Sequence, residues 1–301
     1  TEECLFPRSN IVKFNVKIFF QKENAIPLPK IVIMRSDKIW KSICAAGLIA
    51  VPHGEAEAHP SAGNEDKNAK PNIIFILADD MGYGDLSCYG NSNIETPNID
   101  RLAATGTRFT QCYAGSAVSS PSRCALMTGR NTGHTPIRDN FAQAGGIEGK
   151  KGEQTIRRMH LLPSDTTIAT VLGAGGYRTC LVNKWHLDGF NPEATPLNRG
   201  FDEFYGWLIS TPYSNDPYYY PYWRFDNYRL GNIEENADGR HVKHNTDIST
   251  DDAIRFIRRN RENPFFLYLA YDAPHEPYNI DDTHWYDDEY QAVCLSGYPH
   301  G

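Results

Sequence analysis

Apolar runs of strand length alternate with segments of helical period through the middle of the chain. Residues 72–78 and 265–271 are continuous apolar runs, which is the pattern of strands covered on both faces of a parallel sheet. Two more strands are expected at residues 108–113 and 178–182. Because strands that alternate with helices pack in layers, the pattern predicts an α/β fold with a central, mostly parallel sheet between helices.

Four helices are predicted from their capping and terminating residues. Thr96 and Pro97 are a typical N-cap and first helical residue, and Gly106 follows the end of that helix. Pro121 favours a second helix start, and that helix is expected to run to about Thr128. The other two helices are expected over residues 165–174, stopped by Gly175-Gly176, and after a cap at residues 249–252, ending before Pro264.

Charged side chains follow three of the predicted strands near the point where each strand ends. Asp79 and Asp80 follow the first, Lys184 and His186 the second, and His275 the third. Open α/β sheets bind ligands at the carboxyl edge of their strands, so we expect these side chains to lie close together. Two adjacent carboxylates suit a hard divalent cation, Ca²⁺ or Mg²⁺, better than zinc, although a solvated turn is the alternative for the pair alone.

Composition narrows the class of protein. The 301 residues suffice for one large α/β domain or two small ones, and a hydrophobic fraction of 40% supports a substantial core. A formal net charge of −7 argues against a nucleic-acid partner, because phosphate contacts need clustered lysine and arginine. The seven cysteines include no Cys-x-x-Cys pair, which excludes a zinc ribbon. Disulfides formed after export and buried free thiols both remain open.

The N-terminal part of the sequence is typical of an exported protein. Residues 34–58 combine a basic start, a short apolar run and a small-x-small cleavage site, which is the order of a signal peptide. A buried N-terminal helix is the alternative for this segment. The apolar run is too short to cross a bilayer, so no membrane span is expected. We expect residues 1–33 to be a non-native upstream extension, residues 59–70 to be a polar linker, and the mature protein to be secreted or periplasmic.

The most specific chemical signal is the segment SSPSRCALMTGR at residues 119–130. It places Ser119 just before a predicted helix N-terminus, where unpaired N–H groups favour anions, and Arg123 one helical turn later. A guanidinium group can bind two oxygens at once, so Arg123 suits sulfate or phosphate, although a surface arginine paired with a carboxylate is the alternative. The segment resembles the signature of the type I sulfatases, whose first residue, Cys or Ser, is oxidised after translation to formylglycine.

The resemblance to sulfatases covers most of residues 71–290. Further segments that are similar to the family occur in the family's order, at residues 71–85, 96–113, 184–187, 199–206 and 265–275. The resemblance implies an alkaline-phosphatase-like α/β sandwich, with a catalytic domain over residues 71–301 that is incomplete at its C-terminus. It also implies that the protein hydrolyses sulfate esters of a small molecule or a glycan.

The family's functional residues can be carried over onto matching positions of this chain. By this resemblance, Ser119 becomes formylglycine, whose hydrated aldehyde attacks sulfur, and a formylglycine-generating maturase is an implied partner. Asp79, Asp80 and the modified Ser119 would ligate Ca²⁺, with Mg²⁺ as the other candidate. The other implied catalytic residues surround the nucleophile: Arg123 would hold the hydrate, Lys184 would contact hydrate and sulfate, His186 would take a proton from the sulfated hydrate, and His275 would help to protonate the leaving alcohol.

The sequence departs from the family pattern at several positions. Asn183 and Asp188 stand where the family usually has glycine, and we expect both to be tolerated. The family also continues through an Asp-Asn strand end and a later lysine, whereas residues 294–301 show no apolar period and carry two breakers. A truncated, non-catalytic sulfatase remnant is therefore one alternative, and a phosphoesterase of the same superfamily is another.

The substrate is less well determined than the reaction. Aromatic side chains crowd residues 205–228, and two interpretations remain open for them. They stack on the sugar rings of a sulfated glycan, or they form a loop that covers the core. Sulfated glycans and simple aryl sulfates therefore both remain candidate substrates.

Overall fold

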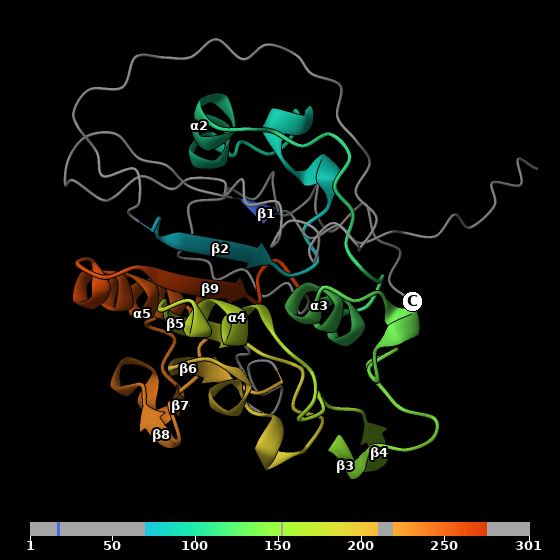
Figure 1. The fold of residues 1–301 in the computed structure, drawn as a ribbon. Coiled ribbons are helices and arrows are strands. Elements are labelled where there is room, and N and C mark those ends of the chain that lie inside the picture. Colours follow the sequence, from blue (N-terminus) through green and yellow to red (C-terminus); the bar gives the residue numbers. More distant parts are fainter. Residues whose placement is uncertain (1–16, 19–69, 152, 210–218, 276–301) are drawn as a thin grey trace, which may run out of the picture.

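The computed structural model describes residues 17–18, 70–151, 153–209 and 219–275 (Figure 1). Its main sheet has the strand order β1-β2-β9-β5-β6-β7-β8. The strands are β1 (Lys17–Ile18), β2 (Ile73–Ala78), β5 (Arg178–Lys184), β6 (Glu203–Trp207), β7 (Trp223–Asp226), β8 (Arg229–Asn232) and β9 (Phe265–Tyr271). The four central strands β2, β9, β5 and β6 are parallel, and β1, β7 and β8 pair antiparallel with their neighbours. This parallel centre is the sheet that the apolar runs predict.

Helices lie against the sheet and in the connections (Figure 1). The α-helices are α2 (Pro97–Thr105), α3 (Ser119–Thr128), α4 (Ile168–Ala174) and α5 (Asn245–Asn260). Short 3-10 helices cover Tyr83–Asp85, Ser87–Tyr89, Thr132–His134, Pro192–Ala194, Pro196–Arg199 and Glu234–Gly239. A separate antiparallel hairpin is formed by β3 (Ile147–Lys151) and β4 (Gln154–Arg158).

The two faces of the sheet carry two different cores. Alternate residues of a strand point to opposite faces, so neighbours along β5 and β9 enter different clusters. Leu181 and Phe266 pack with Leu172 of α4 on one face. Val182 and Leu267 pack on the other face in a cluster that also contains Ala253 and Phe256 of α5. Both faces of β5 and β9 are therefore buried, which explains the continuous apolar sequence of β9.

Several predicted elements are confirmed, and one is wrong. β2, β9, α2 and α3 match their predicted positions closely, and Ser119 is the first residue of α3 rather than the residue before it. Residues 108–113 form no strand: Phe109 and Tyr113 are exposed, and none of the strands in the described part of the chain pairs with them. Apolar residues on a surface loop gave the same local pattern as a buried strand.

Two helix starts also differ from the prediction. α4 begins at Ile168, three residues late, because the Thr167 side chain accepts a hydrogen bond from the Thr170 N–H and caps the helix. α5 begins at Asn245, four residues before the predicted cap, and is capped by His244. Ser249, the expected cap residue, is buried inside the helix and donates a hydrogen bond to the side chain of Asn245. The predicted end before Pro264 is confirmed.

The described aromatic residues of the segment 205–228 are divided between the interior and the surface, where Tyr222 and Tyr228 are exposed. Trp207, Tyr219 and Tyr220 are buried, which supports the core-covering interpretation for these three residues. The described cysteines are free thiols: Cys88, Cys112, Cys124 and Cys180. Within the described part of the chain, no helix is long and apolar enough to cross a membrane.

The predicted domain boundaries remain predictions. The expected signal peptide at residues 34–58, almost all of the linker at residues 59–70 and the tail at residues 294–301 lie outside the described residues. Of the expected upstream extension, only β1 is described, and it pairs antiparallel with β2 through Lys17 opposite Leu77.

Candidate active site

The predicted site residues converge at the carboxyl edge of the parallel sheet. Asp79 and Asp80 follow β2, Lys184 ends β5, and His275 lies four residues beyond the end of β9. The start of α3 lies beside this edge in Figure 1 and contributes Ser119 and Arg123. Hydrogen bonds and ion pairs connect five of the seven predicted site residues to one another, and a longer contact of 3.7 Å connects the other two. The first group is Asp79, Ser119, Arg123, Lys184 and His186; the second is Asp80 and His275.

Ser119 is held between a cation and an imidazole. As the first residue of α3, it lies one helical turn before Arg123, whose Nε donates a hydrogen bond to Ser119 Oγ at 3.0 Å. The Nδ1 atom of His186 lies 3.2 Å from the same oxygen. The helix N-terminus beneath it adds partial positive charge. The surroundings of this hydroxyl therefore favour negative charge on its oxygen.

A buried ion cluster lies directly behind the serine. Arg123 Nη2 is 3.3 Å from Asp79 Oδ2, and Lys184 Nζ donates to that same oxygen. Arg123 Nη1 also donates to the carbonyl oxygen of Lys184 at 2.9 Å. Burial disfavours the charged form of Asp79, but Lys184 and Arg123 outweigh it and hold the pKa of that carboxyl well below its usual range. Asp79 is therefore ionised at every physiological pH.

Asp80 and His275 form the outer side of the site. Asp80 has a φ of +63°, a conformation that non-glycine residues seldom adopt and that turns the chain sharply after β2. Its Oδ2 atom is 3.7 Å from His275 Nε2. The carbonyl oxygen of His275 accepts a hydrogen bond from the Tyr219 hydroxyl, which ties this loop to the buried aromatic residues.

His186 is a buried, neutral imidazole. Burial, followed by the charges of Lys184, Arg158 and Arg123, lowers its pKa well below the usual value for histidine. Its Nε2 atom is 2.6 Å from Arg158 Nη1. At neutral pH, the imidazole can therefore donate one proton and accept one, but it carries no charge.

The structure adds site residues that the sequence analysis missed. Asp272 directly follows β9, and its Oδ1 atom lies 3.9 Å from Lys184 Nζ while its Oδ2 atom accepts from Asn245 Nδ2 at 3.1 Å. Asp272 directly follows an apolar strand, as Asp79 does, so the same sequence pattern could have identified it as a site residue. Asn183, with a φ of +78°, donates to Asn245 and Ser249 at 3.1 and 2.9 Å, which explains how it is accommodated where the family has glycine.

The oxygen donors at this edge are of the chemical types that bind a hard divalent cation, but they are too few to complete its coordination. Asp79 and Asp80 provide carboxylates and Ser119 a hydroxyl, the donor types that Ca²⁺ and Mg²⁺ prefer. Calcium takes six to eight oxygens, so these three residues supply only part of its ligands. Among the described residues, no three His, Cys, Asp or Glu side chains form a metal cluster by themselves. Lys184 and Arg123 meanwhile neutralise Asp79.

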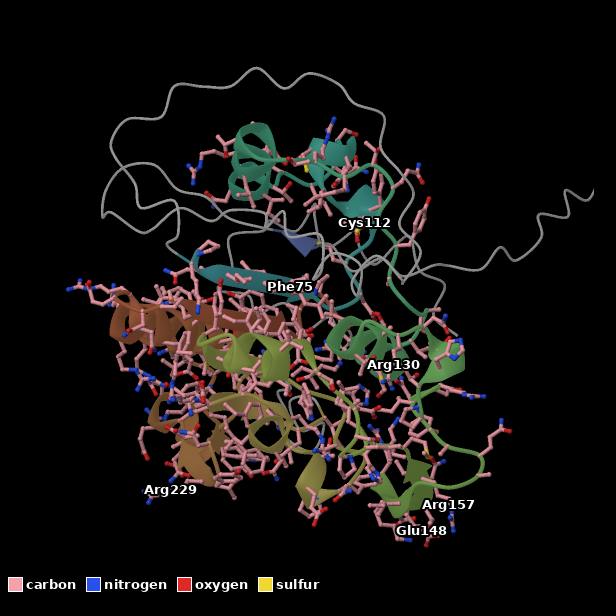
Figure 2. The ribbon with its side chains drawn as sticks, viewed as in Figure 1. Phe75, Cys112, Arg130, Glu148, Arg157 and Arg229 are labelled. Carbon is pink, nitrogen blue, oxygen red and sulfur yellow. The ribbon has the colours of Figure 1, made fainter. Side chains whose placement is uncertain are left out.

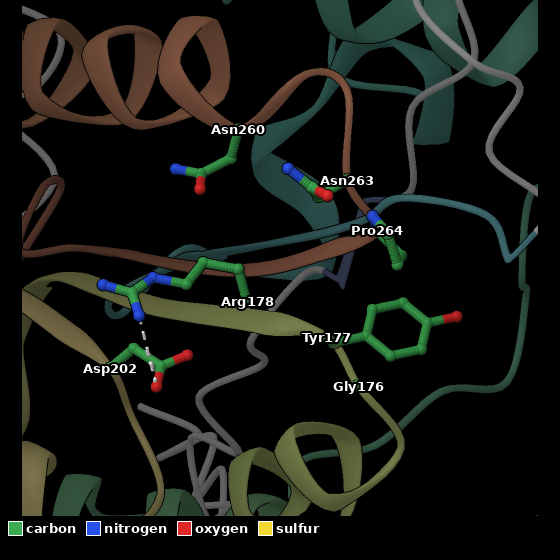
Figure 3. A pocket seen from close by; sticks show the side chains of 7 residues that line it. All are labelled: Gly176, Tyr177, Arg178, Asp202, Asn260, Asn263 and Pro264. Atoms are coloured by element: carbon green, nitrogen blue, oxygen red, sulfur yellow. Dashed lines mark ion pairs between the residues drawn. The ribbon is translucent and has the colours of Figure 1, made fainter.

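A cavity of about 360 Å³ lies at the opposite end of the central strands (Figure 3). Arg178, the first residue of β5, borders it and pairs with Asp202 at 3.5 Å. Asn263 and Pro264, just before β9, also line it. None of the predicted site residues lines this cavity, so it is separate from the site around Ser119.

Comparison with known proteins identifies relatives that are similar to this chain in sequence. The chain is similar to N-acetylgalactosamine-6-sulfatase from Sus scrofa, with 37% identity over 232 residues, covering 69% of this chain and 40% of the relative. It is also similar to arylsulfatase H from Canis lupus familiaris, with 44% identity over 147 residues, covering 46% of this chain and 25% of the relative. The chain thus spans two fifths of the first relative's length and a quarter of the second's.

Solved structures that are similar to this chain in both sequence and fold were also found. Ps i-CgsB superposes with a TM-score of 0.56 at 32% identity, over 71% of this chain and 47% of that chain. BT4656, solved in complex with its substrate D-glucosamine-2-N,6-O-disulfate, superposes with a TM-score of 0.54 at 30% identity. The match covers 70% of this chain and 36% of that chain. The family model described as Sulfatase matches residues 71–299, which is most of the sequence. The chain therefore belongs to the sulfatase family and covers part of the sulfatase domain.

Proposed function

We propose that the protein hydrolyses sulfate esters at Ser119, after conversion of that residue to formylglycine, with Ca²⁺ held by Asp79, Asp80 and Ser119. The observation that carries this proposal is the position of Ser119 Oγ, 3.0 Å from Arg123 Nε and 3.2 Å from His186 Nδ1. An unmodified serine is a weak nucleophile, whereas a hydrated aldehyde offers one hydroxyl for attack and another for later elimination. A bound divalent cation would add charge stabilisation for the sulfate oxygens.

The side chains around Ser119 can perform the remaining tasks. Arg123 and Lys184 bring two positive charges to where the sulfate oxygens would lie, and Asp79 fixes both of them. His186, being neutral, can exchange a proton with the oxygen at Ser119. His275 lies on the outer side, where it can hold a proton for the leaving alcohol.

We propose a sulfated sugar as the substrate class. One structural relative was solved in complex with its substrate D-glucosamine-2-N,6-O-disulfate, and Ps i-CgsB was solved in complex with k-i-k-neocarrahexaose. Release of sulfate from glucosamine 6-sulfate and from an aryl sulfate would be compared directly. Hydrolysis of the aryl ester alone would contradict the sugar assignment.

We also propose export and maturation by a partner enzyme. Residues 34–58 would direct export as a cleaved signal peptide, giving a secreted or periplasmic protein, and a formylglycine-generating maturase would act on the segment around Ser119. Recovery of the exported protein with an N-terminus near residue 59 would support this proposal. Retention of residues 34–58 in the exported protein would contradict it.

The central test combines mass spectrometry with an activity assay. The chain is expressed with a formylglycine-generating maturase in the presence of Ca²⁺, and the tryptic peptide spanning residues 109–123 is analysed. We expect the loss of two hydrogen atoms at Ser119 and the release of sulfate, both abolished in Ser119→Ala. A converted residue without sulfate release, or release that persists in Ser119→Ala, would overturn the proposal. Ser120→Ala, at the next position of the same helix, is the matched control and should retain conversion and release.

A further inference from the structure

We propose that Arg158 is a positioning residue that fixes the tautomer of His186, so that His186 Nδ1 donates a hydrogen bond to Ser119 Oγ. Arg158 is the last residue of β4, in the hairpin that the sequence patterns did not predict. The catalytic consequence rests on the proposed function. The hydrogen-bond arrangement itself does not, and it can be tested without any turnover.

The tautomer follows from the chemistry of the two partners. Arg158 Nη1 lies 2.6 Å from His186 Nε2, and a guanidinium has only donors and stays charged in proteins. The Nε2 atom must therefore accept this hydrogen bond. A neutral imidazole that accepts at Nε2 carries its one proton on Nδ1. That proton faces Ser119 Oγ, which is 3.2 Å away.

Arg158 is held in place by packing on two aromatic rings. It is buried, and its guanidinium carbon lies 5.3 Å from the ring centre of Phe141 and 5.6 Å from that of Phe190. The Phe190 ring in turn packs directly on the backbone of Gly149 in β3, where a built Cβ would come within 2.5 Å of it. The hairpin is thus packed against the loop that follows His186.

Backbone hydrogen bonds support the same packing. The N–H of Leu161 donates to the carbonyl oxygen of Leu187 at 3.1 Å, just beyond His186. The His186 N–H donates to the carbonyl oxygen of Leu208 at 2.6 Å, which anchors the other side of the loop. Both ends of the Arg158–His186 contact are therefore fixed by the fold.

This arrangement affects the chemistry at Ser119. Arg123 Nε–H and His186 Nδ1–H both donate to Ser119 Oγ and would stabilise negative charge on that oxygen. Accepting a proton at Nδ1 requires that Nδ1 first lose its proton and that Nε2 gain one. An Nε2–H would face the N–H of Arg158, so the contact must open before His186 can act as a base.

The test reads the tautomer directly by two-bond ¹H–¹⁵N spectra of the full chain with ¹⁵N-labelled histidine and unmodified Ser119. The resonances of His186 are assigned from the spectrum of His186→Gln. We expect a protonated Nδ1 and an accepting Nε2 in the wild type. Arg158→Met keeps an unbranched side chain but removes the donor, so the population should shift to the Nε2–H form. Arg158→Lys retains a donor and should restore the Nδ1–H form.

A neighbouring arginine provides the matched control. Arg157 lies on the same strand, half-exposed, and its Nη2 atom pairs with Glu148 Oε2 at 3.1 Å on the surface of the hairpin (Figure 2). Arg157→Met should leave the His186 signals unchanged. A wild-type His186 protonated on Nε2, or an Nδ1–H form that persists in Arg158→Met, would overturn the proposal. If Arg158→Met does not fold, the wild-type and Arg158→Lys spectra still decide it.

Activity gives a separate readout. In the protein with formylglycine, Arg158→Met should lower kcat about a hundredfold and leave KM nearly unchanged, because a misplaced catalytic group affects the chemical step more than binding. Arg158→Lys should recover part of the loss. Because the spectra use unmodified Ser119, a protein that releases no sulfate would contradict the proposed function and leave the tautomer assignment standing. An unchanged kcat in Arg158→Met would contradict the catalytic consequence alone.

Discussion

At the scale of single residues, the site depends on one carboxylate oxygen, Asp79 Oδ2, that contacts the charged groups of both Lys184 and Arg123. Asp79 Oδ2 accepts from Lys184 and lies 3.3 Å from Arg123, and all three side chains are buried. A buried charge that loses its partner is costly, because neither water nor another ion compensates it. The neighbouring Asp80 is more exposed, and its described ion pair is a longer one with His275, at 3.7 Å.

This contrast gives a prediction for two adjacent carboxylates. Asp79→Asn should lower the free energy of unfolding by about 3–5 kcal/mol, since Lys184 and Arg123 lose their nearest negative charge and Asp272, 3.9 Å from Lys184, compensates only part of it. Asp80→Asn should lower it by less than about 1 kcal/mol, as expected for a partly exposed pair. Urea denaturation without added metal measures both. Equal losses would show that the ion cluster does not stabilise the fold.

A second residue-scale prediction concerns pH. Burial, opposed by backbone hydrogen bonds from Phe190 and its neighbours, raises the pKa of Asp188 to about 6. The folded state then holds a proton that the unfolded state has lost between about pH 4 and pH 6. This contribution to stability is complete below about pH 4 and is lost as pH rises through 6, a change of about 3 kcal/mol.

Asp188→Asn should remove this dependence. The amide oxygen of asparagine can still accept from the Phe190 N–H, which lies 3.1 Å from Asp188 Oδ2. The stability of the variant relative to wild type should therefore rise between pH 4 and pH 6 and stay constant above about pH 7. Thermal or urea unfolding across this range tests it, and a difference that does not vary with pH would contradict the raised pKa.

Residues that follow apolar strands could be predicted from the sequence, whereas residues brought in from elsewhere could not. Asp79, Lys184 and His275 were expected together because parallel strands end at one edge, and the structure brings them there. Arg158 reaches His186 from a hairpin 28 residues earlier in the sequence, and no local pattern encodes that contact. Such a contact depends on how β3 and β4 pack against the rest of the fold.

At the scale of elements, β5 and β6 approach each other closely at a glycine. Gly206 has a φ of +150° and lies opposite Asn183 in the register of the two strands. A Cβ built at Gly206 would overlap the carbonyl oxygen and backbone of Asn183. Because Asn183 directly precedes Lys184, this approach of the two backbones also affects the position of a site residue.

Gly206→Ala should therefore destabilise the sheet and disturb the site. We expect a loss of about 1–3 kcal/mol in the free energy of unfolding, because the added methyl group must displace backbone. Gly231→Ala in β8 is the matched control, since a Cβ there would find its nearest neighbours at 3.8 Å. Its expected change is within about 0.5 kcal/mol. Denaturation of both variants tests this, and similar losses would show that the contact is not the cause.

Elements with a strong periodic signal were predictable, and elements defined by tertiary pairing were not. β9 is buried on both faces and β2 is buried on one face and half-buried on the other, so both sequences are apolar throughout. β8 has exposed residues at three of its four positions, so burial imposes no apolar pattern on it. The expected strand at residues 108–113 failed for the opposite reason, because an apolar sequence there lies on the surface.

At the scale of the whole molecule, the sheet joins segments that are far apart in the sequence. β2 pairs with β9, and the Asn72 side chain accepts a hydrogen bond at 3.1 Å from the buried N–H of Phe265, which lies 193 residues away. A buried N–H without a partner costs about 1–3 kcal/mol. The Asn72 side chain therefore helps to hold together β2 and β9, which are the first and last of the four parallel strands along the sequence.

Removing that side chain should weaken the whole sheet. Asn72→Ala should lower the free energy of unfolding by about 1–3 kcal/mol, because the Phe265 N–H loses its acceptor. Asn263→Ala, at an exposed position just before β9, is the matched control and should change stability little. Urea denaturation would be compared for the two variants. A larger loss in Asn263→Ala would contradict the assigned role of Asn72.

The pairing of β2 with β9 also has a consequence during protein synthesis. A ribosome adds about 5–20 residues per second, so β9 is completed some 10–40 s after β2 has left it. For that interval, an apolar strand of the nascent chain has no parallel neighbour and can pair with strands of other nascent chains. The order of strands in the sheet therefore leaves β2 open to pairing with other chains during synthesis, whatever the stability of the finished fold.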